Sequence, residues 1–196
     1  MDICKKKQKK IKPDSEEELT AGDFWGFTAI KRKSFFFTAF AVGKRTVNTC
    51  RLLMNRFEDC IEKPTAENKL EAYSDGNFGY EITLPEYFSE AVMDYGQIIK
   101  VKEKGIVVGK RKKIVFGNPK FIETTSVECH NGVLRGRLAR LARKTKCHSK
   151  CKYRLEGHIA LFQFYWNFIK PIHGKQSPGM EEGLTHKLWT WGNFLH

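Results

Sequence analysis

The order of apolar and polar positions in the first part of the chain predicts paired strands. Residues 23–30 and 34–42 are mostly aromatic, β-branched or small and do not alternate, which is typical of strands covered on both faces. The basic residues 31–33 between them predict a turn, so the two strands should pair. Residues 69–74 predict a further short strand, which ends at Asp75 where a glycine follows.

Two later segments repeat apolar residues at steps of three and four, the period of an amphipathic helix. The first covers residues 46–61 and is expected to end at Pro64. Its apolar positions are Val47, Cys50, Leu53, Met54, Phe57 and Ile61. The second, residues 125–144, is the longest predicted helix. Its stripe consists of Val127, Asn131, Leu134, Leu138 and Leu141.

Residues 155–169 predict another helix near the carboxyl end of the chain. Its aromatic residues are Phe162, Phe164, Tyr165, Trp166 and Phe168. We assign them to the core, and stacking on nucleic-acid bases is the less favoured alternative. The tail with Trp189, Trp191 and Phe194 is expected to pack back on this helix.

A hairpin is predicted between the short strand and the longest helix. Residues 97–102 and 113–116 form its strands, and the basic residues 105–113 lie near its turn. We interpret the module, residues 95–120 in round numbers, as an insertion into an α/β sheet domain. With no long linker inside residues 20–196, these form one domain after a charged arm at residues 1–19.

The charge balance indicates the kind of partner. The chain of 196 residues has 35 Lys and Arg against 22 Asp and Glu, a net charge of +13. Its 41% hydrophobic and 13% aromatic residues exclude a disordered basic tail. A folded basic domain attracts polyanions, of which nucleic acid is the usual one, ahead of anionic membranes or acidic proteins. No apolar run approaches the roughly 18 residues of a spanning helix, so a soluble chain without a membrane partner is expected.

Positive charge is concentrated in residues 135–154, which contain nine Lys or Arg and no Asp or Glu. These are Arg135, Arg137, Arg140, Arg143, Lys144, Lys146, Lys150, Lys152 and Arg154. A solvated helix face normally mixes both signs, because like charges four residues apart repel. The one-sided charge therefore favours binding of a polyanion.

The six cysteines are expected to be thiols or metal ligands rather than disulfides. Residues 1–12 lack the apolar core of a secretory signal, which favours a reducing compartment. Cys129, His130, Cys147 and Cys151 suggest a zinc site as an alternative. The Cys-x3-Cys spacing without a second cysteine pair is unusual for structural zinc, so free thiols are favoured.

Three acidic residues occupy positions suited to chemistry, since ligands of open α/β sheets gather at the carboxyl ends of strands. Asp23 opens an apolar strand, Asp75 closes another, and Glu128 lies in the first turn of the basic helix. Each also has an ordinary explanation. Asp23 suits an exposed position before a strand, Asp75 suits a turn with Gly76, and Glu128 suits a capping box begun at Thr125.

Four stretches carry a combined pattern. The first contains residues 22–30 (GDFWGFTAI) and 42–46 (VGKRT), and the second contains Ser74-Asp75-Gly76 followed by Tyr80 and Pro85. The third runs from Thr124 through Glu128, Asn131, Leu134, Arg135, Arg140, Leu141 and Arg143-Lys144-Thr145 to Ser149-Lys150. The fourth contains residues 165–171 (YWNFIKP), 177–180 (SPGM), 183–185 (GLT) and 188–189 (LW). In this order, over roughly residues 20–194, they resemble the DDE transposases of bacterial and archaeal insertion sequences, in the group founded on the first insertion sequence described.

The resemblance implies a ribonuclease-H-like (retroviral-integrase-like) fold, a mixed sheet flanked by helices with a β-hairpin insertion before the glutamate helix. It also implies that Asp23, Asp75 and Glu128 are the catalytic residues and converge on two Mg²⁺ or Mn²⁺ ions. Carboxylate oxygens are the ligands that such hard cations prefer. Two cations can promote in-line displacement at phosphorus, first by water and then by a DNA 3′-hydroxyl, which gives strand cleavage and strand transfer. The acids are 52 and 53 residues apart, and the second interval, which is long for such enzymes, agrees with the hairpin being the insertion of one subgroup.

The resemblance also implies a DNA-binding surface after the glutamate. Its expected members are Asn131, Arg135, Arg137, Arg140, Arg143, Lys144, Lys146 and Lys150. Glu128 and Arg135 share a helix face, and Asn131 lies beside it. Asn131 and Arg135 are therefore expected to engage phosphates or to orient the glutamate. The partners are then element ends and target DNA, bound by a homo-oligomer, and the expected location is the bacterial or archaeal cytoplasm at the nucleoid.

Departures from the family pattern leave a second interpretation open. The family carries an amino-terminal zinc and helix-turn-helix region, whereas only 22 residues with one cysteine precede Asp23. Cys129 and His130 follow Glu128 where the family has Arg, and Gly132 costs about 1 kcal/mol in a helix. We therefore expect either a separately encoded DNA-recognition domain or a truncated, non-catalytic DNA-binding remnant.

Overall fold

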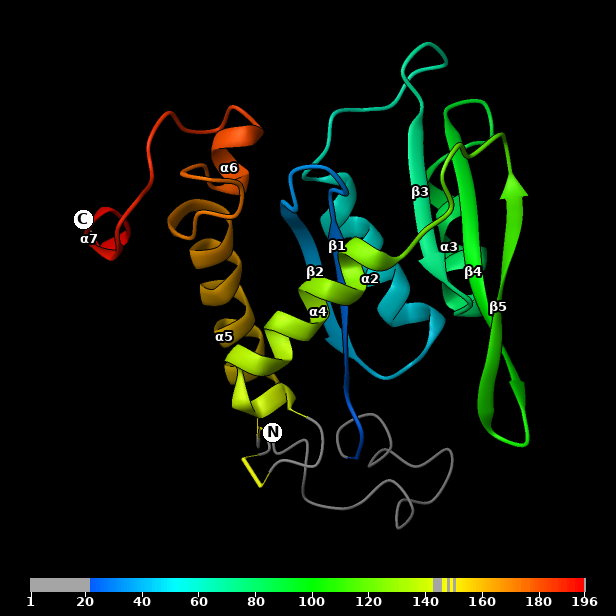
Figure 1. Ribbon diagram of the computed structural model, residues 1–196, viewed down its shortest axis with the longest axis horizontal. Coiled ribbons are helices and arrows are strands. Elements are labelled where there is room, and N and C mark those ends of the chain that lie inside the picture. Colours follow the sequence, from blue (N-terminus) through cyan, green and yellow to red (C-terminus); the bar gives the residue numbers. More distant parts are fainter. Residues whose placement is uncertain (1–21, 143–145, 148, 150, 196) are drawn as a thin grey trace. The chain divides into compact units, whose positions relative to one another are not determined.

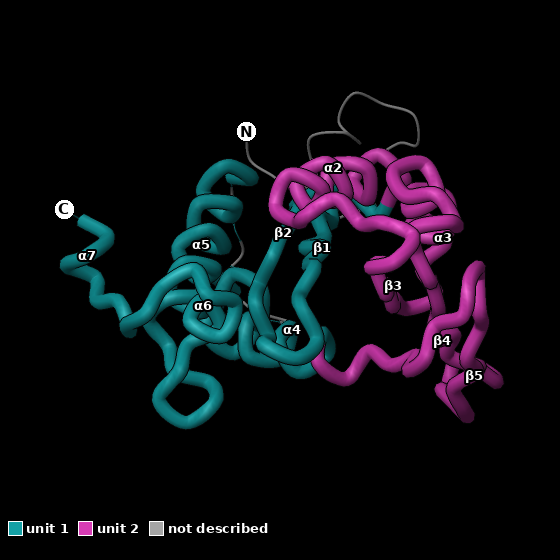
Figure 2. The backbone as a smooth tube through the Cα atoms, turned by 90° about the horizontal axis from the view of Figure 1, so that it is seen from above, with its two compact units in different colours: residues 1–45, 127–196 teal, residues 46–126 magenta. Residues whose placement is uncertain are grey.

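The computed structural model describes residues 22–142, 146–147, 149 and 151–195. They fall into two compact units (Figure 2): unit 1 lies within residues 1–45 and 127–196, and unit 2 is residues 46–126. Unit 1 contains a two-stranded sheet and unit 2 a three-stranded mixed sheet, each accompanied by helices (Figure 1). The prediction of a mixed α/β protein is confirmed.

The sheet of unit 1 is an antiparallel pair of strands, β1 (Trp25–Ile30) and β2 (Phe37–Gly43). A bulge near the end of β1 brings Ile30 opposite Phe37. The predicted pairing is confirmed, although β1 begins two residues after Asp23 and the loop between the strands extends beyond the three basic residues.

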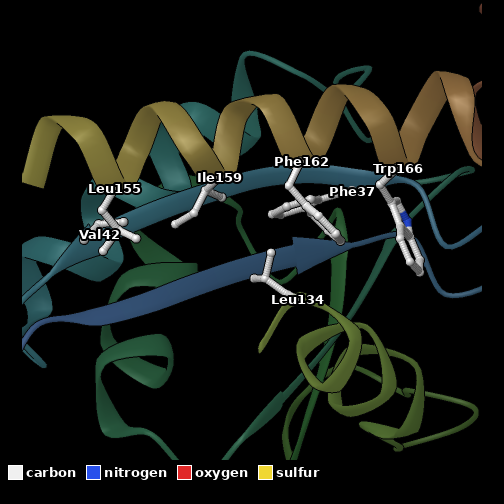
Figure 3. Packing of buried hydrophobic residues seen from close by; sticks show 7 residues of the cluster. All are labelled: Phe37, Val42, Leu134, Leu155, Ile159, Phe162 and Trp166. Carbon is white, nitrogen blue, oxygen red and sulfur yellow. The ribbon is translucent and has the colours of Figure 1, made fainter. Parts of the chain in front are cut away.

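Helix α5 (Lys152–Phe164) continues into η3 (Tyr165–Ile169), a π-helical segment, and the two cover the β1–β2 pair. Four apolar side chains at helical spacing point toward the strands (Figure 3). They belong to a buried cluster made of Phe37, Val42, Leu134, Leu155, Ile159, Phe162 and Trp166. This confirms the predicted helix and the assignment of Phe162 and Trp166 to the core.

Polar side chains of α5 and η3 satisfy the backbone of β2 on the edge away from β1. The Asn167 side chain accepts the Phe37 N–H at 2.8 Å and donates to the Phe37 carbonyl at 3.0 Å. Gln163 donates to the carbonyls of Phe37 at 2.7 Å and Thr38 at 3.0 Å. Asn167 therefore acts like a neighbouring strand, which meets the need of buried backbone groups for partners.

The loop before β2 carries one strained residue. Phe35 has a φ of 58°, a left-handed conformation that costs an ordinary residue roughly 1–2 kcal/mol. The indole Nε1 of Trp166 donates to the Phe35 carbonyl at 2.8 Å. Trp166, Asn167 and Gln163 thus lie on one helical surface, and together they supply hydrogen-bond partners to the backbone of residues 35–38.

Helix α4 (Thr125–Arg137) is shorter than predicted. Leu138 is extended, and a 3-10 turn, η2 (Ala139–Leu141), follows it. The expectation of a continuous helix to residue 144 is therefore wrong. The helix contains Gly132 and Gly136, which weaken it, while Leu138 and Leu141 pack against the unit 1 cluster from outside the helix.

The carboxyl-terminal segment contains two short helices, α6 (Pro178–Glu181) and α7 (Trp191–Leu195). Its aromatic rings meet those of α5 and η3. Trp189 lies 5.2 Å from Phe168, Phe194 lies 4.4 Å from Phe164, and Trp191 stacks on Tyr165, all measured between ring centroids. The prediction that the tail packs back on this helix is confirmed.

Unit 2 is built around the strand order β3–β4–β5. Strand β3 (Leu70–Asp75) runs parallel to β4 (Met93–Glu103), and helix α3 (Phe78–Tyr87) connects them. Strand β5 (Ile106–Phe116) pairs antiparallel with β4. The predicted hairpin is confirmed but longer than expected, because the basic stretch forms most of β5 rather than its turn.

Helix α2 (Val47–Glu58) confirms the first amphipathic helix, although it ends well before Pro64. It packs against α3 at Gly79, where an added Cβ would come within 2.6 Å of the Cys50 sulfur. Helix α3 was not among the predicted elements, and its pattern is interrupted by this glycine and by Pro85 in the last turn.

Replacing Asn167 tests the closure of the β2 edge. Asn167→Ala leaves the buried Phe37 N–H without its acceptor, which should lower the free energy of unfolding of unit 1 by about 2–3 kcal/mol. Urea denaturation followed by tryptophan fluorescence measures this loss. Asn118→Ala, at an exposed position, should change stability by less than about 0.5 kcal/mol, and equal effects of the two changes would refute the role of Asn167.

Candidate functional site

The three predicted carboxylates are exposed and lie at or near the ends of regular elements. Asp23 precedes β1 by two residues, Asp75 is the last residue of β3, and Glu128 lies in the first turn of α4. Asp23 and Glu128 belong to unit 1, whereas Asp75 belongs to unit 2. Their convergence on shared cations therefore stays a prediction.

Local hydrogen bonds fix the turn that carries Asp75. The Oδ1 atom of Asp75 accepts the Asn77 N–H at 3.2 Å, and the Asn77 side chain accepts the Gly79 N–H at 3.2 Å, which caps α3. The ordinary turn role of Asp75 is thus present. A carboxylate has about four acceptor positions, so one such bond leaves capacity for a cation.

A chain of hydrogen bonds ties the end of β3 to β4. Gln97 Nε2 donates to the Tyr95 hydroxyl at 2.9 Å, the Tyr95 and Ser74 hydroxyls are 2.7 Å apart, and Ser74 donates to the Asp75 carbonyl at 2.8 Å. Burial raises the pKa of Tyr95 to about 12, so its hydroxyl stays protonated at neutral pH. This chain holds the Asp75 backbone in place from inside unit 2.

Two cations lie over aromatic rings beside Asp23. The Lys44 ammonium is 4.7 Å from the Phe24 ring centroid, and the Arg45 guanidinium is 5.5 Å from the Trp25 centroid. Trp25 is 51% exposed. Such cation–π contacts contribute about 0.5–1 kcal/mol at exposed sites. The end of the strand pair next to Asp23 therefore combines a carboxylate with positive charge and an accessible ring.

Asn131 connects the glutamate helix to the first strand. The Thr28 hydroxyl donates to Asn131 Oδ1 at 2.8 Å, and both residues are partly buried. This bond fixes α4 against β1 one turn after Glu128. Asn131 therefore helps to hold α4 against β1, and its expected roles toward phosphates or the glutamate stay predictions.

Of the predicted DNA-binding cations that the structure describes, only Arg135 and Arg137 lie on α4. Arg135 is half-buried on α4, whereas Arg137, Arg140 and Lys146 are exposed. Arg143, Lys144 and Lys150, together with the arm at residues 1–19, lie outside the described residues. Because α4 ends at Arg137, Arg140 does not continue its helical face.

His130 is a core residue. Its side chain is fully buried, with the Phe37 ring at 4.5 Å and the Trp166 ring at 4.8 Å between centroids. Neither ring nitrogen has a hydrogen-bond partner among the described residues. Burial lowers the pKa of His130 to about 4, so the ring is neutral at pH 7.

The zinc alternative is not supported by this arrangement. Cys129 and Cys147 are exposed, Cys151 is partly exposed, none of these three forms a disulfide, and His130 faces aromatic rings instead of sulfur. Within the described part of the chain, no three His, Cys, Asp or Glu side chains gather in a group that could hold a metal ion.

Comparisons with family models, curated proteins and solved structures give no match for this chain. In the described ranges, no helix has the length and apolar character required to cross a membrane.

The buried histidine predicts a pH dependence of stability. Because the His130 pKa falls from 6.5 to about 4 on folding, the unfolded chain binds the extra proton between these pH values. Stability is therefore fully retained above pH 6.5 and is lost as the pH falls, by up to about 3 kcal/mol. His130→Phe should remove this loss when urea midpoints at pH 7 and pH 4.5 are compared.

His186→Gln, a change at an exposed histidine, provides the control and should keep the wild-type pH dependence. An identical fall in stability for wild type and His130→Phe would contradict the assignment of this titration to His130.

Proposed function

We propose that the chain is the catalytic domain of a DDE transposase of the insertion-sequence type, with a ribonuclease-H-like arrangement, which cleaves and joins DNA strands with divalent cations. The observation that carries the proposal is the geometry around Asp75: an exposed carboxylate at the carboxyl end of a parallel strand, on a turn fixed by buried hydrogen bonds. The four stretches that resemble the family and the net charge of +13 support the same activity.

The donor set fits hard cations. Asp23, Asp75 and Glu128 offer carboxylate oxygens, and each is exposed to solvent in its own unit. When bound, two Mg²⁺ or Mn²⁺ ions would supply activation of the attacking oxygen and stabilisation of the leaving oxygen. The role of the protein in this proposal is to hold the three carboxylates where they can bind these cations.

Residues around the carboxylates have separate tasks in this proposal. The Gln97–Tyr95–Ser74 chain orients the Asp75 turn, and the Thr28–Asn131 bond orients the helix of Glu128. Exposed Arg137, Arg140 and Lys146 bind phosphates, because cations that neutralise phosphates release condensed counterions and gain affinity.

Single neutralising substitutions test this proposal. In a plasmid-nicking assay with Mg²⁺ or Mn²⁺, wild type should nick DNA, and Asp23→Asn, Asp75→Asn and Glu128→Gln should each lower the rate by at least about 100-fold through lost transition-state stabilisation. DNA affinity in the absence of metal should stay the same or rise, because each change removes a negative charge. Asp59→Asn and Glu90→Gln, at exposed acids outside the site, should keep wild-type nicking.

Element-end DNA, offered to the chain joined to an added recognition domain, provides the second substrate. Absence of metal-dependent cleavage on both substrates would refute the catalytic proposal. Salt-sensitive DNA binding that survives without cleavage, and that Glu128→Gln leaves unchanged, would instead establish the alternative function, a non-catalytic DNA-binding remnant.

A further inference from the structure

The β4–β5 hairpin extends beyond the sheet as a two-stranded ribbon. Strand β3 pairs with β4 only as far as Ile98, whereas β4 and β5 remain paired to Glu103 and Ile106 (Figure 1). Five residues of β4 thus continue past the last β3 contact, which corresponds to about 17 Å of extended strand. The side chains of residues 100–108 are all exposed.

The pairing register places four lysines on one face of this ribbon. Lys100 and Lys102 share a face because alternate residues of a strand point the same way. Lys110 lies directly opposite Lys100, and Lys112 lies opposite Ile98, two residues along, so both belong to the same face. All four lysines are exposed. We call Lys100, Lys102, Lys110 and Lys112 the lysine face.

The opposite face is different in charge and in surroundings. Lys113 pairs there with Glu81 of α3 at 2.5 Å, and Gln97 and Tyr95 on that face are buried. Residues 99–113 contain seven Lys or Arg and a single acid, Glu103, which alternates away from the lysine face. Four of these seven cations therefore lie on one exposed side, while Arg111 and Lys113 lie on the other.

The lysine face contains more lysines than the protection of a sheet edge against pairing requires. Isolated lysines on an edge strand are enough to prevent pairing with another sheet. Lys100 and Lys110, however, occupy directly opposed positions on neighbouring strands, where like charges destabilise the pair. Four exposed lysines on one face can contact several phosphates at once, so the register favours a polyanionic partner.

We propose that the lysine face binds the phosphate backbone of duplex DNA, with the ribbon lying along the major groove. A two-stranded β-ribbon fits that groove, which is about 12 Å wide, and lysines on the ribbon reach its flanking phosphates. The choice of DNA among polyanions rests on the proposed function. This surface lies on unit 2 and is separate from the cations after Glu128, so it adds a second DNA contact to the chain.

A fourfold lysine variant and a matched control test the proposal. The variant is K100Q/K102Q/K110Q/K112Q, and the control K33Q/K63Q/K175Q/K187Q removes the same charge at exposed lysines elsewhere. Binding of a fluorescent duplex of about 20 base pairs is measured by anisotropy over a salt series, where each phosphate contact contributes about 0.9 to the log–log slope. The variant should lower the slope by about 3 and the affinity at least about tenfold, while the control should change the slope by less than about 1.

Thermal melts of both proteins confirm folding, and added duplex should raise the Tm of wild type and control more than that of the variant. Equal slopes for variant and control would overturn the proposal, as would tighter binding of the lysine face to RNA duplexes or to vesicles of anionic lipid than to DNA. The outcome is separable from catalysis. If the variant nicks DNA with metal and binds DNA as wild type does, only the proposed ribbon contact is refuted. If DNA binding depends on the ribbon but wild type does not nick DNA, only the catalytic proposal is refuted.

Discussion

Unit 1 depends on the contact between the α5–η3 segment and the outer edge of β2. The bidentate bond of Asn167 to Phe37, supported by Gln163 and by Trp166 at Phe35, supplies the partners that a further strand would otherwise provide. Leaving a buried N–H unpaired costs about 1–3 kcal/mol. This contact therefore allows a sheet of only two strands to be buried in the core of unit 1. The position of α4, and hence of Glu128, follows from packing against the same cluster.

In unit 2 the sheet is completed by a strand instead of by helix side chains. Its sheet is completed by the hairpin, and the buried Gln97–Tyr95–Ser74 chain fixes the strand end at Asp75. Each unit therefore presents exposed carboxylates on a rigid support while also carrying a concentration of positive charge. In unit 1 the charge follows Glu128, and in unit 2 it lies on the ribbon. Both features suit a protein whose substrate is a long polyanion.

Sequence patterns predicted those elements in which local periodicity and tertiary packing agree. This group consists of the β1–β2 pair, α2, β3 and α5. The apolar run of α5 and η3 contains the polar residues Gln163 and Asn167 because their side chains hydrogen-bond the backbone of β2. Packing overrides local pattern elsewhere. The apolar stripe of α4 continues in Leu138 and Leu141, which reach the core from outside the helix after the chain has left helical geometry. Helix α3 went unpredicted because Gly79 and Pro85 weaken its signal, although Asn77 is a capping residue.

The places of the candidate carboxylates in the fold were predictable, whereas their role as one site stays a prediction. The positions of Asp23, Asp75 and Glu128 near element ends follow from turn and strand signals in the sequence. His130 resembled a metal ligand beside Cys129, yet burial among Phe37, Phe162 and Trp166 makes it a core residue, an outcome that depends on contacts over about 90 residues and carries no local signal. The lysine face could not be predicted either, because the register that places Lys100 opposite Lys110 is defined only by the pairing of β4 with β5.

Paramagnetic quenching by Mn²⁺ tests most directly whether Glu128 belongs to the proposed divalent-metal site. A nitroxide on Cys129, an exposed thiol next to Glu128, is observed in a chain whose Cys4, Cys60, Cys147 and Cys151 are replaced by Ser. The account predicts strong, saturable quenching by Mn²⁺ that Glu128→Gln abolishes, because this change removes the proposed metal ligand next to the label. Quenching that is absent, or that persists unchanged in Glu128→Gln, would contradict it.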